Sequence, residues 1–91
     1  GHTYRIAETI REKIMREMER EVPYSTMVQI ERMTDHGHLV EIHALICVER
    51  EGQKKIIIGE KGAALKSIGI HARRDIERIL GKKVMLKLWV K

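Results

Sequence analysis

The stretch IIGEKGA, residues 57–63, places two glycines three positions apart, directly before a long helical pattern. Glycine lacks a Cβ atom, so Gly59 and Gly62 permit a sharp turn and let a second backbone come close to the peptide chain. A helix that begins here presents unsatisfied N–H groups and the positive end of its dipole, and both attract anions. Lys61 and Lys66 add positive charge beside the turn. The stretch therefore predicts a clamp for a sugar-phosphate chain.

The segments on either side of this turn predict two helices. Residues 63–80 carry an apolar stripe at helical spacing, formed by Leu65, Ile68, Ala72, Ile76 and Ile79. Gly69 inside this helix costs about 1 kcal/mol relative to alanine, which suggests that another group approaches the backbone there. Gly81 is suited to end the helix. Residues 53–58 fit a strand or a helix by periodicity alone, and we adopt a short helix.

Alternating apolar and polar side chains predict three strands. Residues 25–34 and 39–49 form a β-hairpin, joined by a turn in which Gly37 supplies a positive φ and Asp35 bonds to nearby backbone. Residues 84–90, after the long helix, form the third strand. The predicted inward side chains are Val28, Ile30, Val40, Ile42, Ala44, Ile46, Val48, Val84, Leu86, Leu88 and Val90.

The N-terminal segment predicts an amphipathic helix from Thr3 to about Glu21, with Thr3 as its N-cap. Pro23 prevents the helix from continuing. The apolar stripe comprises Ile6, Ile10, Ile14 and Met18. The ion pairs expected on the solvent side are Glu12 with Arg16 and Lys13 with Glu17.

The predicted elements give the order α-β-β-α-α-β. The third strand follows a helical crossover from the second, which favours parallel pairing through a right-handed connection. The helices then cover one face of a three-stranded mixed sheet, so the fold class is α+β with two layers. Gly1-His2 resembles a tag remnant, and residues 3–91 form a single domain.

Charge is concentrated around the glycine turn. The chain carries a net charge of +5, and residues 53–74 hold six basic side chains against one acidic side chain, Glu60. The rest of the chain holds 12 basic and 12 acidic residues, so the whole excess lies in this segment. Such a basic patch is typical of a polyanion binder, although a solvated helix face is the alternative interpretation. The single cysteine, Cys47, excludes an internal disulfide and suits a cytoplasmic setting.

Three longer stretches support a family resemblance. They are IREKIMREMEREVPYS (residues 10–25), IHALICVEREGQKKIIIGEKG (42–62) and IGIHARRDIERILGKKVMLKLWVK (68–91). VEREGQKK before the glycine turn and LWVK after the long helix are more specific than the glycines. The chain resembles the C-terminal KH domain, of type II, in bacterial Era-type GTPases.

The resemblance implies a role for the chain and for a longer protein around it. It implies binding of single-stranded RNA at the 3′ end of small-subunit (16S) ribosomal RNA, during maturation of the small ribosomal subunit. It also implies a GTPase domain in cis, a further C-terminal tail, and a monomeric, cytoplasmic protein that associates peripherally with the inner membrane. No phosphate-loop motif is present in this sequence, so we expect no enzymatic activity and no cofactor for this chain.

The predicted RNA contacts surround the glycine turn. They are Lys54, Lys55, Ile57, Ile58, Gly59, Glu60, Lys61, Gly62, Ala63, Ala64 and Lys66. Because aromatic side chains are scarce, we expect bases to lie in an aliphatic groove between the helices and the sheet edge, with apolar contact from Ile57, Ala63 and Ala64. Ile57 could equally belong to the core. KH domains often carry basic residues at both central positions of the glycine turn, and Glu60 departs from that pattern. Aspartate at Gly59, or at both Glu60 and Lys61, is expected to abolish binding with the fold intact.

The histidines, Trp89 and the helix pair around the glycine turn suggest other functions. His36, His38 and His43 lack the cysteine or carboxylate spacing of a structural zinc site, so no metal is expected. Trp89 should lie on the outer sheet face and could mark a protein-interaction surface, or it could be an ordinary half-covered side chain. Binding of duplex DNA by a helix pair would leave the glycines unexplained.

Overall fold

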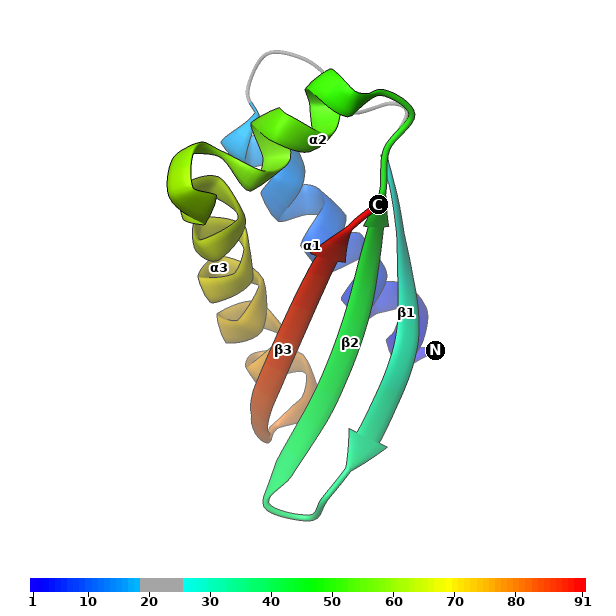
Figure 1. The fold of residues 1–91 in the computed structure, drawn as a ribbon. Coiled ribbons are helices and arrows are strands. Elements are labelled where there is room, and N and C mark those ends of the chain that lie inside the picture. The colour runs from blue at the N-terminus through cyan, green and yellow to red at the C-terminus, as the bar shows by residue number, and fades with distance from the viewer. Residues whose placement is uncertain (19–25) are drawn as a thin grey trace.

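Helices pack on one face of a twisted sheet in the computed structural model (Figure 1). The structure describes residues 1–18 and 26–91. The elements are α1 (His2–Glu17), β1 (Met27–Asp35), β2 (Leu39–Cys47), α2 (Glu51–Ile58), the 3-10 turn η2 (Glu60–Gly62), α3 (Ala63–Leu80) and β3 (Lys83–Val90). This order and the two layers confirm the predicted α+β fold. Residues 53–58, which fitted a strand or a helix by periodicity, belong to helix α2, as predicted.

The sheet has the strand order β1-β2-β3. β1 pairs antiparallel with β2, and β3 pairs parallel with β2 after the crossover through α2 and α3. The predicted hairpin turn is confirmed, because the Gly37 N–H donates to Asp35 Oδ1 at 2.8 Å. A bulge between Ile30 and Arg32 shifts the register of β1, so its alternation holds only up to Ile30.

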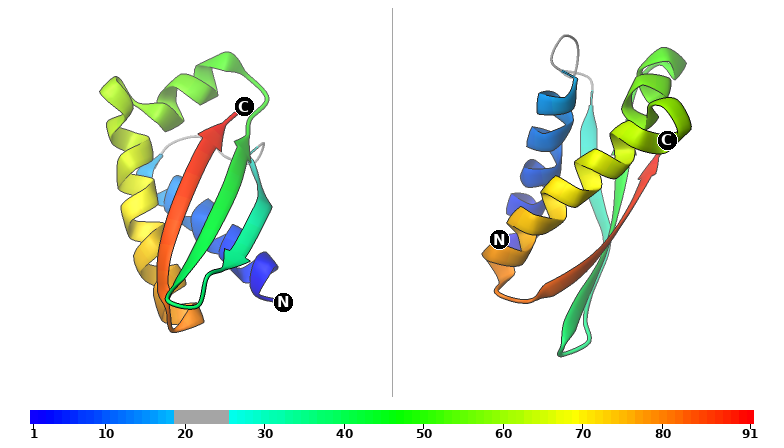
Figure 2. Two further views of the ribbon diagram at one scale, coloured as in Figure 1. Left: turned by 60° about the horizontal axis from the view of Figure 1, so that its bottom comes forward. Right: turned by 90° about the vertical axis from the view of Figure 1, so that its left-hand side faces the viewer.

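The core lies between the sheet and the two long helices. α1 and α3 lie side by side on the same face of the sheet (Figure 2). The buried apolar side chains are Ile6, Ile10, Ile14, Val40, Ile42, Ala44, Ile46, Ile57, Ile68, Ala72, Ile76 and Val84. Isoleucine dominates, so branched side chains from helices and strands interlock across the layers. Within the described ranges, no helix is long and apolar enough to cross a membrane.

The start of α1 differs from the prediction. The helix begins at His2, and Gly1 is its N-cap without a side-chain hydrogen bond. Thr3 therefore lies inside the first turn, and its prediction as the N-cap was wrong. Met18 follows the last helical residue. The predicted end at Glu21 and the stop at Pro23 lie outside the described residues.

Lys13 joins α1 to α3. The pair of Glu12 with Arg16 is confirmed at 3.1 Å. Lys13 instead turns inward, where its side chain is only 9% exposed and its Nζ lies 2.6 Å from Asp75 Oδ2. The predicted solvent-side pair with Glu17 is therefore wrong. The hydrogen bond from Lys13 lowers the pKa of Asp75, since it stabilises the charged carboxylate.

The Lys13→Ala substitution should lower the free energy of unfolding by about 2 kcal/mol, because it removes the main partner of Asp75 at a half-buried contact. Arg16→Ala provides the matched control, since its ion pair is exposed and contributes about 0.5 kcal/mol at most. Urea denaturation of both variants measures the difference. Equal losses would show that the Lys13 contact contributes no more than a surface pair.

Candidate nucleic-acid interface

The two glycines of the predicted clamp both adopt conformations that other residues avoid. Gly59 is the C-cap of α2, with φ 76° and ψ 174°, and Gly62 is the N-cap of α3, with φ 78° and ψ 10°. A Cβ atom on Gly59 would lie 2.7 Å from Ala64 Cβ and 2.8 Å from Ala64 N. Gly59 is therefore required both by its φ and by the close approach of α3, whereas Gly62 is required by φ alone.

Glu60 and Lys61 form the exposed tip of this turn. Lys61 adopts a left-handed conformation, with φ 55° and ψ 26°, which costs about 1 kcal/mol for a residue with a Cβ. Among the described residues, Glu60 pairs with neither Lys61 nor Arg50, so its carboxylate points to solvent. The tip thus presents one negative and one positive side chain to any ligand.

Several backbone N–H groups at the turn already have partners. Gly59 N–H donates to Lys55 O at 2.8 Å, and Gly62 N–H donates to Gly59 O at 3.1 Å. Ala63 N–H donates to Glu60 O. These bonds hold the turn in shape and leave fewer N–H groups for a phosphate. Side-chain charge and the α3 dipole must therefore carry more of any anion binding than the glycine motif suggests.

A groove of about 420 Å³ runs between α3 and β3, beginning at the glycine turn. Its lining residues are Gly62, Leu65, Lys66, Gly69, Ile70, Arg73, Leu86 and Leu88. The helical members recur every three or four residues, so they form one face of α3. β3 is the edge strand beside them. The groove is therefore apolar along its length, with a basic side chain from each of two helical turns.

None of the three predicted apolar groove residues, Ile57, Ala63 and Ala64, lines this groove. Ile57 is 3% exposed and belongs to the core, so the expectation that its side chain contacts bases was wrong. Ala63 is exposed and Ala64 is half-buried, and neither lines the groove. Ile58, unlike the buried Ile57, is half-buried at the end of α2. The apolar lining comes instead from α3 and β3.

The basic residues of the prediction lie on α2, on α3 and, for Lys61, at the turn between them. Lys54 and Lys55 lie on α2, and Lys66 lies on α3 beside the groove. Arg73 was not among the predicted contacts, although it lines the groove one helical turn beyond Gly69. A second stripe of positions at helical spacing, from residue 62 to residue 73, lies beside the core stripe of α3. This stripe could have identified Arg73 from the sequence.

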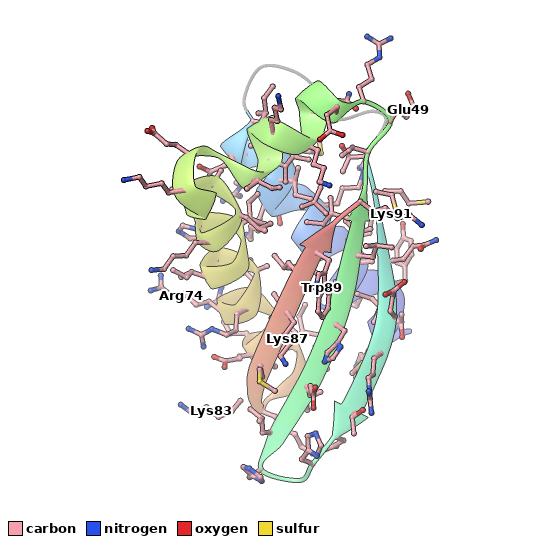
Figure 3. All side chains as sticks on the ribbon, in the orientation of Figure 1. Glu49, Arg74, Lys83, Lys87, Trp89 and Lys91 are labelled. Carbon is pink, nitrogen blue, oxygen red and sulfur yellow. The ribbon has the colours of Figure 1, made fainter. Side chains whose placement is uncertain are left out.

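The carboxylate of Glu77 holds Arg73 at the end of the groove that is farther from the glycine turn. Arg73 Nη1 lies 3.1 Å from Glu77 Oε2, and the same oxygen accepts the Val84 N–H at 2.9 Å. The backbone hydrogen bond and the nearby guanidinium lower the pKa of Glu77. Arg74, on the next position of α3, extends away from the sheet (Figure 3).

The outer sheet face carries a separate cluster. Trp89 is 47% exposed and lies with Lys87 on β3 (Figure 3). The rings of His43 and Trp89 are 5.3 Å apart between centroids and tilted by 53°. Glu41 lies 3.0 Å from His36 Nε2 and 2.6 Å from His43 Nε2, and these hydrogen bonds lower its pKa to about 2. Across residues 1–18 and 26–91, no group of three or more potential ligands could hold a metal ion.

Comparisons with known proteins agree on one family. A family model described as KH domain matches residues 21–91. GTPase Era from Pseudomonas aeruginosa and GTPase Era from Marinobacter nauticus are each 59% identical over 85 residues. Each alignment covers 93% of this chain but 28% of the relative, so the chain spans a little over a quarter of the proteins it matches.

Two solved structures show the same fold at a TM-score of 0.94 and 42% identity. One is Aquifex aeolicus Era bound to GDP and AlF4⁻, and the other is Era in complex with MgGDPNP and nucleotides 1506–1542 of 16S ribosomal RNA. Each superposition covers 100% of this chain and 31% of the other chain. The chain therefore belongs to the KH domain family, in the type II form that the resemblance to Era-type GTPases predicted.

Proposed function

We propose that this chain binds single-stranded RNA, with the sugar-phosphate backbone held at the Gly59–Gly62 turn and the bases in the groove along α3. The observation that carries this proposal is the position of the apolar groove, which begins at Gly62, in the basic part of the chain. An apolar slot lined by edge-strand and helix residues accepts unstacked bases, while the adjoining positive charge attracts phosphates.

The RNA is proposed to be the 3′ end of small-subunit ribosomal RNA. Support comes from the solved Era complex with nucleotides 1506–1542 of 16S ribosomal RNA, because 31% of that Era chain superposes on the whole of this chain. By the same reasoning, the whole protein would join this RNA contact to a GTPase domain elsewhere in its chain and act on the small ribosomal subunit. In this proposal, the side chains of Lys54, Lys55 and Lys66 contact the RNA phosphates.

Chemical-shift titration with a short single-stranded oligonucleotide from this RNA tests the proposal. The expected shifts map to the Gly59–Gly62 turn, α3 and β3, and duplex DNA of equal length should compete poorly. Because phosphate contacts release counterions, affinity should fall with salt at a log–log slope of about −0.7 per contacted phosphate. Shifts confined to the outer sheet face, or equal affinity for duplex DNA, would contradict it.

The exposed Trp89 supports a second candidate function, which is protein binding through the outer sheet face. A large apolar side chain that is 47% exposed beside His43 and Lys87 resembles the centre of an interface. Trp89→Ala separates the two functions, since it should leave RNA affinity unchanged if the groove is the RNA site. Loss of RNA affinity in this variant would move the RNA site to the outer face.

A further inference from the structure

Gly69 lies in the middle of α3, where neither the backbone conformation nor the packing demands a glycine. Its φ is not in the left-handed region, unlike those of Gly59 and Gly62. Glycine is also the least favourable residue in a helix interior apart from proline. The sequence therefore carries a destabilising residue at a position where alanine would serve the helix better.

The neighbours of Gly69 would accept a side chain. Among the described residues, and apart from the chain neighbours and the nearby backbone of its own helix, only Leu88 Cδ1 lies within 4 Å of the position that a Cβ would occupy, and its distance is 3.6 Å. That is ordinary van der Waals contact, in contrast to the 2.8 Å from a Gly59 Cβ to Ala64 N. Close helix–strand packing, the usual reason for a helical glycine, is therefore absent at this position.

Gly69 and Leu88 both line the groove between α3 and β3. A Cβ on Gly69 would extend beside Leu88 into this groove and narrow it at mid-length. Without that Cβ, a flat ring can lie directly against the helix backbone. Lys66 and Arg73 lie three residues before and four residues after Gly69 on the same helical face, so a positive charge stands on each side of this position.

We propose that Gly69 is a specificity-determining residue for RNA: it admits one unpaired nucleobase against the α3 backbone, opposite Leu88. This inference rests on the proposed function, because it assumes that RNA bases enter the groove. It adds that a base comes closest to the protein at the α3 backbone of Gly69. This point is separate from the glycine turn, which is proposed to hold the RNA backbone.

The test compares Gly69→Ala with Gly52→Ala in the 91-residue chain. Gly52 is a matched control, since it is also helical, in α2, and a Cβ there would meet nothing within 4 Å in the described part of the chain. Gly69→Ala should raise Tm by a few degrees, about 4 °C, through helix propensity. It should also weaken binding of a single-stranded oligonucleotide from the 3′ end of small-subunit ribosomal RNA by about tenfold, the effect of losing one base contact.

Abasic scanning identifies the nucleotide that Gly69 admits. In the unsubstituted chain, removal of one particular base should weaken binding by about tenfold. In Gly69→Ala, removal of the same base should change nothing further, because the variant already excludes it. Gly52→Ala should bind every oligonucleotide as the unsubstituted chain does.

Failure of the inference is distinguishable from failure of the proposed function. If the unsubstituted chain does not bind the oligonucleotide, both are overturned. If it binds and Gly69→Ala binds equally well, RNA binding stands and the role of Gly69 is overturned. A lower Tm in Gly69→Ala would also overturn it, because the glycine would then serve packing.

Discussion

Replacing Glu60 and Lys61 together with aspartate should weaken RNA binding by about 100-fold, equivalent to about 2.7 kcal/mol. The double variant turns the tip from one charge of each sign into two negative charges facing the RNA phosphates. Both side chains are exposed, so no packing contact is lost. Aspartate also tolerates the left-handed conformation that Lys61 adopts, with φ 55°. The fold should therefore survive with nearly unchanged Tm.

Two single variants show which charge matters. Glu60→Asp keeps the charge and should bind almost as well as the unsubstituted chain. Lys61→Asn removes one positive charge, fits the left-handed conformation and should have an intermediate effect. Affinity is measured by fluorescence anisotropy with a labelled single-stranded oligonucleotide, and circular dichroism checks the fold. Full affinity in the double variant would exclude the glycine turn as the backbone clamp.

Gly59→Ala should reduce the free energy of unfolding by about 3 kcal/mol or more. Its φ of 76° and ψ of 174° lie in a region that is almost restricted to glycine. The added Cβ would also lie 2.8 Å from Ala64 N, a backbone atom that can move only if the start of α3 moves. The expectation that aspartate at Gly59 leaves the fold intact is corrected for the same reason: its Cβ would meet the same strain, so the variant should be destabilised.

Gly62→Ala is the control for this prediction. Its φ of 78° is also positive, but a Cβ there would meet nothing within 4 Å among the described residues. We expect a loss of about 1 kcal/mol from backbone strain alone. Urea denaturation compares the two variants directly. Similar losses at both positions would show that the approach of Ala64 to Gly59 is relieved by local adjustment.

Local patterns predicted those parts of the fold that depend on one element at a time. The isoleucine stripe of α1, the stripe of α3 and the alternation along β2 each reflect burial of one face, and each was confirmed. Errors arose where contacts between elements decide the outcome. Lys13 fits the polar side of an isolated helix, yet it pairs with Asp75 once α3 packs beside α1. Ile57 has exposed Ile56 as its neighbour, and only packing selects which of them is buried.

The candidate site shows the same division. Two glycines three residues apart permit a sharp turn, and the charges around them can be counted directly. The sequence by itself therefore determined the turn, the local excess of positive charge and, through the matching stretches, the family. Only the tertiary structure revealed the groove proposed to accept bases, because the groove needs β3 beside α3, and these elements meet only after the chain has crossed over the sheet. It also showed that Ala64 leaves no room for a Cβ at Gly59, whereas a Cβ at Gly69 would make only ordinary contact with Leu88 beside the groove.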